Sequence, residues 1–165
     1  MRIGLSCDIH QFAQNRKLVL AGVEIEYEKG LLGHSDADVL THAIAEAILG
    51  ALSLGDLGSF FPDSDPKYKD ISSLILLAEV YRMMDEQGYQ IGNIDSLVMI
   101  EEPKLAKYKT VMQKNIADVL HCNLNQVCIK ATRGERLGFV GRKEGVMAQA
   151  VVLLEEKETI HYAKL

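Results

Sequence analysis

The stretch RIGLSCDIH, residues 2–10, decides how this chain begins to fold, because apolar and polar residues alternate along it as in a half-buried β-strand. One face of this strand carries Ile3, Leu5, Cys7 and Ile9, and the other carries Ser6, Asp8 and His10. Successive side chains of a strand point to opposite faces, so Asp8 and His10 lie on the same side. The strand is therefore predicted to present a carboxylate and an imidazole together.

A helix is predicted shortly after this strand. Ser35 is followed three residues later by Asp38, which is a capping-box pattern, and the apolar residues after Asp38 recur at helical spacing. We therefore expect a helix that begins at Ser35 and ends near Gly55. His34 would stand just before this helix, and His42 would lie on its polar side.

Strand and helix together suggest a metal site. Asp8, His10 and His42 supply one carboxylate and two imidazoles, a set that suits zinc with three protein ligands and an open fourth position. Such open sites are more often catalytic than structural. However, an Asp-x-His pair on a strand is common, and a histidine is usually exposed or simply hydrogen-bonded. Spacing alone leaves both interpretations open.

The rest of the chain has a mixed pattern of strands and helices. We predict a hairpin over 17–27, a loop over 56–69, a helix from Ser72 or Ser73 to Gly88, a strand over 94–100, a helix over 104–122, a strand over 127–131 and a last strand over 145–154. This order predicts an α+β fold, a two-layer sandwich with a mixed β-sheet and helices on one face. The last strand is apolar on both faces, so a partner subunit is expected to cover the open face of the sheet.

Composition limits the classes of protein to consider. The chain has 165 residues, 48% of them hydrophobic and 25% charged, which suits one compact domain. We assign residues 1–156 to a single catalytic domain and 157–165 to a C-terminal tail. The net charge of −5 and the scattered basic residues argue against a nucleic-acid partner. Three cysteines without a Cys-x-x-Cys pair argue against a disulfide framework, and no leader or long apolar run is visible, so we expect a cytoplasmic protein with no membrane association.

An acidic loop, LGDLGSFFPDSDP, occupies residues 54–66. It does not fit an EF-hand calcium loop counted from Asp63, because Tyr68 and Leu74 stand where that loop needs Gly and Glu. Its carboxylates would accept hydrogen bonds from the hydroxyls of a polyol. A merely solvated acidic turn explains the local sequence equally well.

A second polar segment, KATRGERLGF, occupies residues 130–139 after a predicted strand. Its hydroxyl and guanidinium groups suit phosphate oxygens, and Glu135 suits Mg²⁺, which usually takes one or two carboxylates together with phosphate oxygens. An exposed charged turn is the alternative.

Taken in order, five short motifs resemble the 2-C-methyl-D-erythritol 2,4-cyclodiphosphate synthase family of the non-mevalonate isoprenoid pathway. They are Asp-x-His at 8–10, His-Ser-Asp-x-Asp at 34–38, the acidic loop, Pro-Lys-Leu at 103–105, and the segment from Lys130 through the later Arg-x-Glu-Gly. The resemblance runs from Arg2 to about Leu154. It implies a phosphorus–oxygen lyase that closes a cytidine-diphosphate-linked methylerythritol 2-phosphate to the cyclic diphosphate and releases CMP. It also implies a homotrimer with intersubunit active sites.

The resemblance assigns roles to individual residues. It makes Asp8, His10 and His42 the Zn²⁺ ligands, and it places Mg²⁺ or Mn²⁺ at the diphosphate, held by Glu135. From the resemblance we expect His34 and Glu135 to be catalytic, and we add Arg133, whose guanidinium would take the place of the family's hydroxyl. The substrate-binding residues it implies are Asp8, His10, His34, Ser35, Asp56, Leu57, Gly58, Phe61, Pro62, Asp63, Ser64, Asp65, Ile100, Glu101, Glu102, Pro103, Lys104, Leu105, Ala106, Thr132, Arg133, Gly134, Glu135, Phe139 and Arg142. Of these, Thr132 to Glu135 would come from the neighbouring subunit.

The chain departs from the family pattern at three places. Arg133-Gly134 replaces the usual Thr or other small polar residue, Glu101 and Glu102 replace small or amide residues in the cytidine-binding stretch, and Leu5-Ser6-Cys7 replaces a polar-Gly-aromatic run. Two other functions remain open from the sequence. A zinc phosphohydrolase would have no use for the cytidine-binding stretch, and a non-catalytic nucleotide-binding trimer would keep the pocket without turnover.

Overall fold

A five-stranded mixed β-sheet forms the centre of the fold, in the strand order β4-β1-β7-β5-β6. This computed structural model describes residues 1–157, so most of the predicted tail lies outside the described residues. The strands of this sheet are β1 (Arg2–Ala13), β4 (Gly30–Leu31), β5 (Tyr89–Met99), β6 (Val127–Thr132) and β7 (Gly145–Glu156). Strand β7 pairs antiparallel with β1 and β5, whereas β5 and β6 are parallel. The predicted hairpin is confirmed as β2 (Leu18–Leu20) and β3 (Val23–Ile25).

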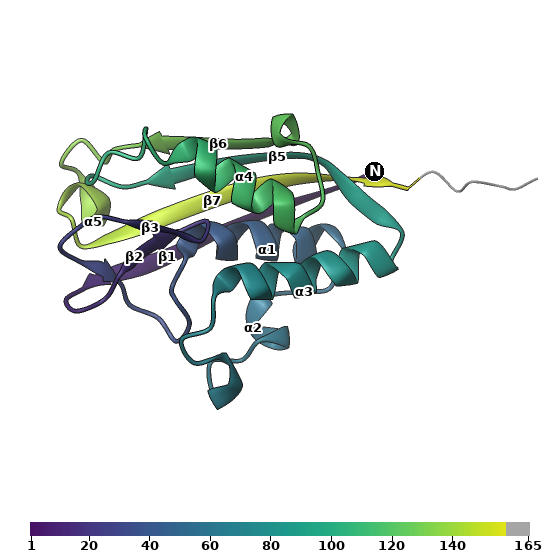
Figure 1. Cartoon of the computed structure of the whole chain (residues 1–165), viewed down its shortest axis with the longest axis horizontal. Helices are drawn as coiled ribbons and strands as arrows, with labels where there is room; N and C mark the ends of the chain where they lie inside the picture. Colours follow the sequence, from purple (N-terminus) through teal and green to yellow (C-terminus); the bar gives the residue numbers. More distant parts are fainter. Residues whose placement is uncertain (158–165) are drawn as a thin grey trace, which may run out of the picture.

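Helices cover one face of this sheet (Figure 1), as predicted. The long helices are α1 (Val39–Ala51), α3 (Ser73–Glu86) and α4 (Lys109–Val119). Helix α1 packs against β1 and β7, and α4 packs against β6. Short helices α2 (Leu57–Phe60) and α5 (Gly138–Gly141) and the 3₁₀ turns η1 (Pro66–Tyr68) and η2 (Leu124–Gln126) complete the described elements. No helix among residues 1–157 has the length and apolar character that crossing a membrane requires.

The two faces of the sheet differ sharply in burial. On the helical side, β7 contributes a run of buried residues: Val146, Ala148, Ala150, Val152 and Leu154. On the other side, the side chains of Ile3 and Leu5 remain 71% and 69% exposed in the single chain. The apolar face of β1 is therefore the uncovered one, and its polar face, with Ser6, Asp8 and His10, points toward α1.

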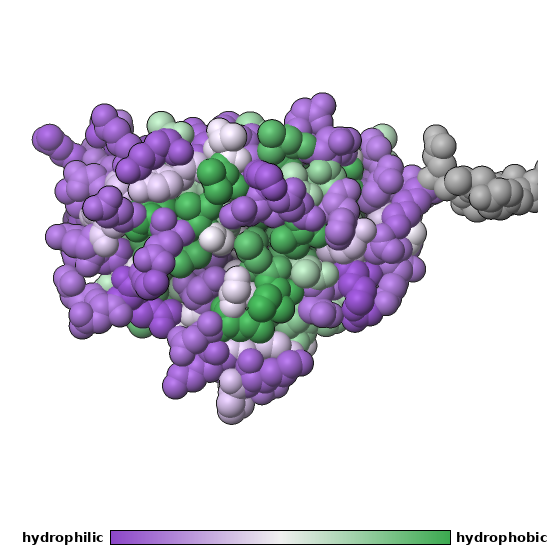
Figure 2. Space-filling model, in the orientation of Figure 1, coloured by the Kyte–Doolittle hydropathy of each residue, from purple (hydrophilic) through white to green (hydrophobic). Residues whose placement is uncertain are grey.

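Apolar surface also reaches the helical side. Figure 2 shows apolar side chains gathered along the middle of the viewed face, around α3 and α4, with polar residues around them. On these helices Ile75 and Val111 remain exposed. This surface is broken up by polar residues, unlike the row of apolar side chains along the free face of β1.

The start of α1 differs from the sequence prediction. The N-cap is Asp38, whose carboxylate accepts a hydrogen bond from the Thr41 amide at 3.0 Å. The Ser35 hydroxyl instead accepts from the Ala37 amide, in a turn where Ala37 has φ +58°. The predicted start at Ser35 is therefore wrong, and so is the end near Gly55, since α1 ends at Ala51. As a result, His34 lies in an irregular segment well before the helix.

Other boundaries also differ. Helix α4 begins at Lys109 rather than 104, because the residues before it form a turn in which Leu105 is buried and its carbonyl accepts from the Tyr108 amide. Strand β5 begins at Tyr89 instead of 94, and its pairing with β7 has an irregularity between Ile91 and Asn93. The loop predicted over 56–69 contains α2 and η1.

Candidate functional site

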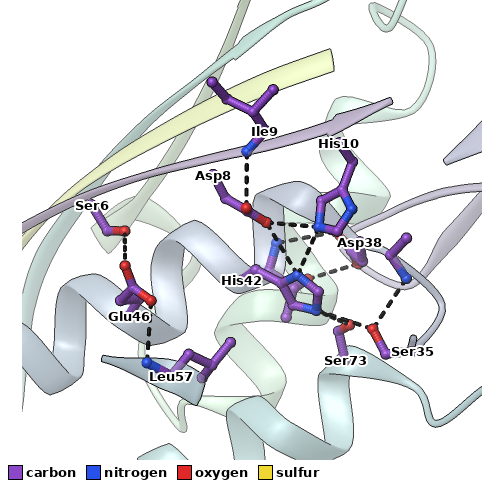
Figure 3. Close-up of polar contacts among 12 residues, drawn as sticks. Ser6, Asp8, Ile9, His10, Ser35, Asp38, His42, Glu46, Leu57 and Ser73 are labelled. Atoms are coloured by element: carbon purple, nitrogen blue, oxygen red, sulfur yellow. Dashed lines mark hydrogen bonds and ion pairs between the residues drawn. The ribbon is translucent and has the colours of Figure 1, made fainter. Parts of the chain in front are cut away.

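The predicted metal ligands come together where β1 meets α1 (Figure 3). Strand β1 supplies Asp8 and His10, and α1 supplies His42. The close approach of these elements depends on Gly4, because a Cβ atom at that position would lie 1.8 Å from the carbonyl oxygen of Ala47 in α1. The absence of a side chain at Gly4 therefore allows strand and helix to bring their ligands to one point.

The three ligand atoms form a compact triangle. Asp8 Oδ2 lies 3.0 Å from His10 Nε2 and 3.1 Å from His42 Nδ1, and the two ring nitrogens are 3.3 Å apart. A tetrahedral zinc ion with metal–ligand distances of about 2.0 Å has donor–donor edges of about 3.3 Å. The set therefore fits zinc in both chemistry and spacing.

Hydrogen bonds outside the triangle fix which ring nitrogen faces it. The other nitrogen of His10, Nδ1, donates to the Leu32 carbonyl at 2.6 Å. His42 Nε2 lies 2.8 Å from the hydroxyl of Ser73, which in turn donates to the carboxylate of Asp36. Hydrogen bonds of this kind orient metal-ligating imidazoles and fix their tautomer.

The electrostatics of the triangle keep its carboxylate ionised. Burial opposes ionisation of Asp8, but hydrogen bonds from His10 and His42, together with their charge, hold the pKa of Asp8 below its ordinary value. Burial lowers the pKa of His10, yet the hydrogen bond and the negative charge of Asp8 outweigh it and raise that pKa. A half-buried carboxylate facing two imidazoles is suited to a divalent cation.

A cavity of about 510 Å³ opens beside the triangle. Besides the three ligands, its walls include Gly33, His34, Ser35, Leu57, Gly58, Phe61, Pro62, Asp63, Tyr68 and Leu76. The ring of His34 is oriented by the Asp65 carbonyl oxygen, 3.1 Å from its Nε2. The acidic loop thus forms one wall. Three predicted residues of that loop, Asp56, Ser64 and Asp65, are not among the cavity-lining residues. The carboxylates of Asp56 and Asp65 instead cap α2 and η1.

The predicted cytidine-binding residues line a second cavity of about 320 Å³. Its walls include Ile100, Glu101, Pro103, Lys104, Leu105, Ala106, Thr132 and Arg133. Glu102 and Glu135 line a neighbouring charged hollow that also includes Arg133. The cavity beside the triangle and this second cavity share no residue, so one chain presents the predicted site as two separate halves.

The departures from the family pattern take part in local structure. The carboxylate of Glu101 accepts a hydrogen bond from the Gly134 amide at 3.0 Å, which ties the loop after β5 to the turn after β6. Glu102 pairs with Lys143 at 2.7 Å. Arg133 and Glu135 face each other at 3.8 Å and remain largely exposed. Of the two remaining predicted residues, Arg142 pairs with Glu144 at 2.8 Å and Phe139 lies in α5.

Sequence reasoning missed Glu46, which supports the site from α1. Its carboxylate accepts from the hydroxyl of Ser6 at 3.0 Å and from the amide of Leu57 at 3.1 Å, at the start of the acidic-loop wall (Figure 3). Glu46 lies one helical turn after His42 in an otherwise apolar run, so its polarity was an available signal. Ser73 gave no such signal, because serine is common where a helix begins.

Comparison with known proteins gives a consistent result. The sequence profile of the YgbB family matches residues 1–155. The chain is 56% identical, over 96% of its length and 99% of the relative, to the 2-C-methyl-D-erythritol 2,4-cyclodiphosphate synthase of Finegoldia magna. It is 57% identical to the enzyme of the same description from Alkaliphilus metalliredigens, over 92% of this chain and 96% of that one.

Solved structures agree with these relatives. Bifunctional IspDF from Campylobacter jejuni has a TM-score of 0.91 and 44% identity, covering 95% of this chain and 42% of that chain. IspF of Plasmodium falciparum in its CDP complex has a TM-score of 0.83 and 34% identity, covering 95% of this chain and 97% of that one.

Proposed function

The chain belongs to the YgbB family, and from this premise we propose how its residues carry out the family's reaction. The activity is that of a 2-C-methyl-D-erythritol 2,4-cyclodiphosphate synthase of the non-mevalonate isoprenoid pathway. This CMP-releasing lyase converts 4-diphosphocytidyl-2-C-methyl-D-erythritol 2-phosphate to 2-C-methyl-D-erythritol 2,4-cyclodiphosphate. The observation that carries the proposal for the site is the triangle of Asp8, His10 and His42 at the wall of the larger cavity.

We propose that this triangle holds Zn²⁺ and that Glu135 holds Mg²⁺ or Mn²⁺ at the diphosphate. When bound, the two cations would act as Lewis acids that neutralise the phosphates and orient them. The donor spacing of the triangle supports the first assignment. The second is supported by the exposed carboxylate of Glu135 beside Arg133, since carboxylate and phosphate oxygens together suit a hard cation.

The chemistry is an intramolecular phosphoryl transfer. An oxygen of the 2-phosphate forms a bond to the β-phosphorus, and the bond from that phosphorus to the CMP oxygen breaks. The attacking phosphate is already anionic near neutral pH, so the step needs positioning and charge neutralisation rather than a general base. We assign His34 and Ser35, both in the cavity wall, to hold the phosphate under attack.

The second cavity takes the cytidine end of the substrate in this proposal. Residues 100–106 would bind the base largely through backbone groups, and Thr132 to Glu135 would approach the diphosphate of a site on a neighbouring subunit. Two observations support a homotrimer with intersubunit sites: the separation of the cavities within one chain, and the exposed apolar face of β1. A single catalytic domain over 1–156 and a cytoplasmic location remain predictions from the sequence.

Incubation of the purified protein with the cytidylylated substrate tests the function directly. The ³¹P spectrum should gain the signals of the cyclic diphosphate and of CMP in equal amounts. In water enriched with ¹⁸O, neither product should take up the label, because the nucleophile is the substrate's own phosphate. Label in a product would indicate a zinc phosphohydrolase, and binding without any new signal would indicate a nucleotide-binding protein.

A further inference from the structure

The segment that carries His34 and Ser35 has no regular secondary structure, so other groups must fix its backbone. Part of this support comes from the chain before α3. The Asp70 amide donates to the His34 carbonyl at 2.8 Å, and the Asp36 amide donates to the carbonyl of Ile71 at 3.1 Å. These two hydrogen bonds fix the backbone of the segment on the side that faces residues 70 and 71.

A single side chain, Arg16, holds the other side of the segment from the turn between β1 and β2. Its Nη2 donates to the carbonyls of Ser35 at 2.7 Å and Gly33 at 3.3 Å, and its Nε donates to the carbonyl of Leu31 at 3.2 Å. These carbonyls belong to alternate residues of the segment. Of the two intervening carbonyls, that of Leu32 accepts from His10 of the metal triangle, so the segment lies between the guanidinium and the triangle.

The geometry requires arginine rather than a cation in general. Three carbonyls and the carboxylate of Asp70, 3.4 Å from Nη1, are contacted by three different nitrogens of one planar group. Lysine offers its donors from a single nitrogen and cannot reach four acceptors spread in this way. Arg16 is only 28% exposed, whereas Asp70 is 65% exposed, so the carbonyl bonds are better shielded from water than the ion pair.

We propose that Arg16 is a positioning residue for the cyclisation, and that it fixes the direction of His34 and Ser35 toward the phosphate under attack. The inference rests on the proposed role of that pair. Arg16 does not line the cavity, so it acts through the backbone of the segment and touches no reacting atom. Small misplacements of a positioned group are costly in phosphoryl transfer, where placement supplies most of the catalysis.

The kinetic test compares Arg16→Lys and Arg16→Ala with Lys17→Ala, the neighbouring exposed cation that pairs with Glu24. Arg16→Lys should keep its zinc and lower kcat/KM by about tenfold or more, chiefly in kcat. Lys17→Ala should stay within about twofold of the parent. Added guanidinium at non-denaturing concentration should restore part of the activity of Arg16→Ala only. If Arg16→Ala does not fold, the lysine variant decides, and parental kinetics in that variant would overturn the proposal.

A measurement without substrate separates this proposal from the proposed function. The chain has five histidines, so their imidazole signals are resolvable by NMR in the zinc-loaded protein. Arg16→Lys should shift the His34 signals and leave those of His121, which packs against Tyr81, unchanged. Unmoved His34 signals would refute the positioning role even if activity fell. If the parent protein released no CMP, the proposed function would be wrong. The NMR measurement would still show whether Arg16 positions His34.

Discussion

Each imidazole of the metal triangle uses one ring nitrogen for the metal position and the other for a hydrogen bond to the protein. His10 uses Nδ1 for the Leu32 carbonyl, and His42 uses Nε2 for the Ser73 hydroxyl. Asp8 is left as the one anion between them. Removing any of the three atoms leaves two donors, which hold zinc far less tightly than three.

Substitution of the helical ligand gives the most direct test of the triangle. His42→Ala should purify with almost no zinc, whereas the parent should contain about one zinc per chain by elemental analysis. His121→Ala is the matched control, because the ring of that histidine packs at a tilt against Tyr81, away from the triangle, and its loss should leave the zinc content unchanged. Full zinc occupancy in His42→Ala would disprove the assignment.

The turn after β6 carries the sharpest departure from the family, Arg133. Its guanidinium lies 3.8 Å from Glu135 and both groups remain exposed, so their mutual attraction contributes little to stability. We expect the guanidinium to act on the α-phosphate instead. Arg133→Ala should lower kcat/KM more than tenfold, or about 1.4 kcal/mol, with an unchanged melting temperature.

A control for this variant is available on α3. Arg82 pairs with two glutamates of its own helix and lies outside both cavities, so Arg82→Ala should keep the parental kcat/KM. An Arg133→Ala enzyme as active as the Arg82→Ala enzyme would mean that Arg133 serves no phosphate, and that Thr132 and the metals suffice.

The site residues that the sequence predicts depend on local patterns, whereas the residues that it does not predict act through long-range contacts. Asp8, His10 and His42 follow from local periodicity, because strand alternation and helical spacing each fix the direction of a side chain. Arg16, Glu46 and Ser73 contact segments distant in sequence, and no local pattern encodes those contacts, although a polar residue in an apolar helical run does single out Glu46. Their roles required the tertiary structure.

Among the elements, β1 and α1 determine the site through their close contact. The start of α1 was predicted wrongly because Ser35 and Asp38 are both good capping residues, and only the turn at Ala37, with its positive φ, assigns the cap to Asp38. The buried carboxylate of Asp38 also accepts from the Gly22 amide at 2.8 Å, which joins the hairpin to the helix. That long-range bond favours Asp38 but is invisible in the sequence.

The contact between β1 and α1 can be tested at Gly4. In Gly4→Ala, the new methyl group would meet the Ala47 carbonyl, so the strand must move away from the helix. Overpacking of this kind costs about 1–3 kcal/mol or more. We therefore expect a lower free energy of unfolding in urea and weaker zinc binding, because His42 separates from Asp8 and His10.

The matched control lies on the same helix. A methyl group at Gly50 would meet no atom within 4 Å apart from the backbone of its own helix and its chain neighbours. Gly50→Ala should therefore raise the free energy of unfolding by about 0.5–1 kcal/mol and leave zinc binding unchanged. Equal stability and zinc affinity in the two variants would show that the contact at Gly4 does not set the triangle.

At the scale of the whole molecule, helices cover only one face of the sheet. The pattern of β7, apolar on both faces, predicts that the open face is covered, and the single chain leaves Ile3, Leu5, Ile9 and Val151 exposed there. The two halves of the proposed site also lie in separate cavities of one chain. A trimer that packs its sheets around a threefold axis would bury the apolar face and join halves from different chains.

Mixed trimers test this arrangement through complementation. A His42→Ala chain lacks the zinc half but keeps the turn with Glu135, and a Glu135→Gln chain has the opposite defect. If each site combines the zinc half of one chain with the turn of its neighbour, random trimers from equal amounts of both chains should regain about a quarter of the parental activity. If both halves of a site belonged to one chain, no site would be intact. Absence of activity in mixed trimers verified by mass spectrometry, or a monomer mass by light scattering for fully active enzyme, would rule out intersubunit sites.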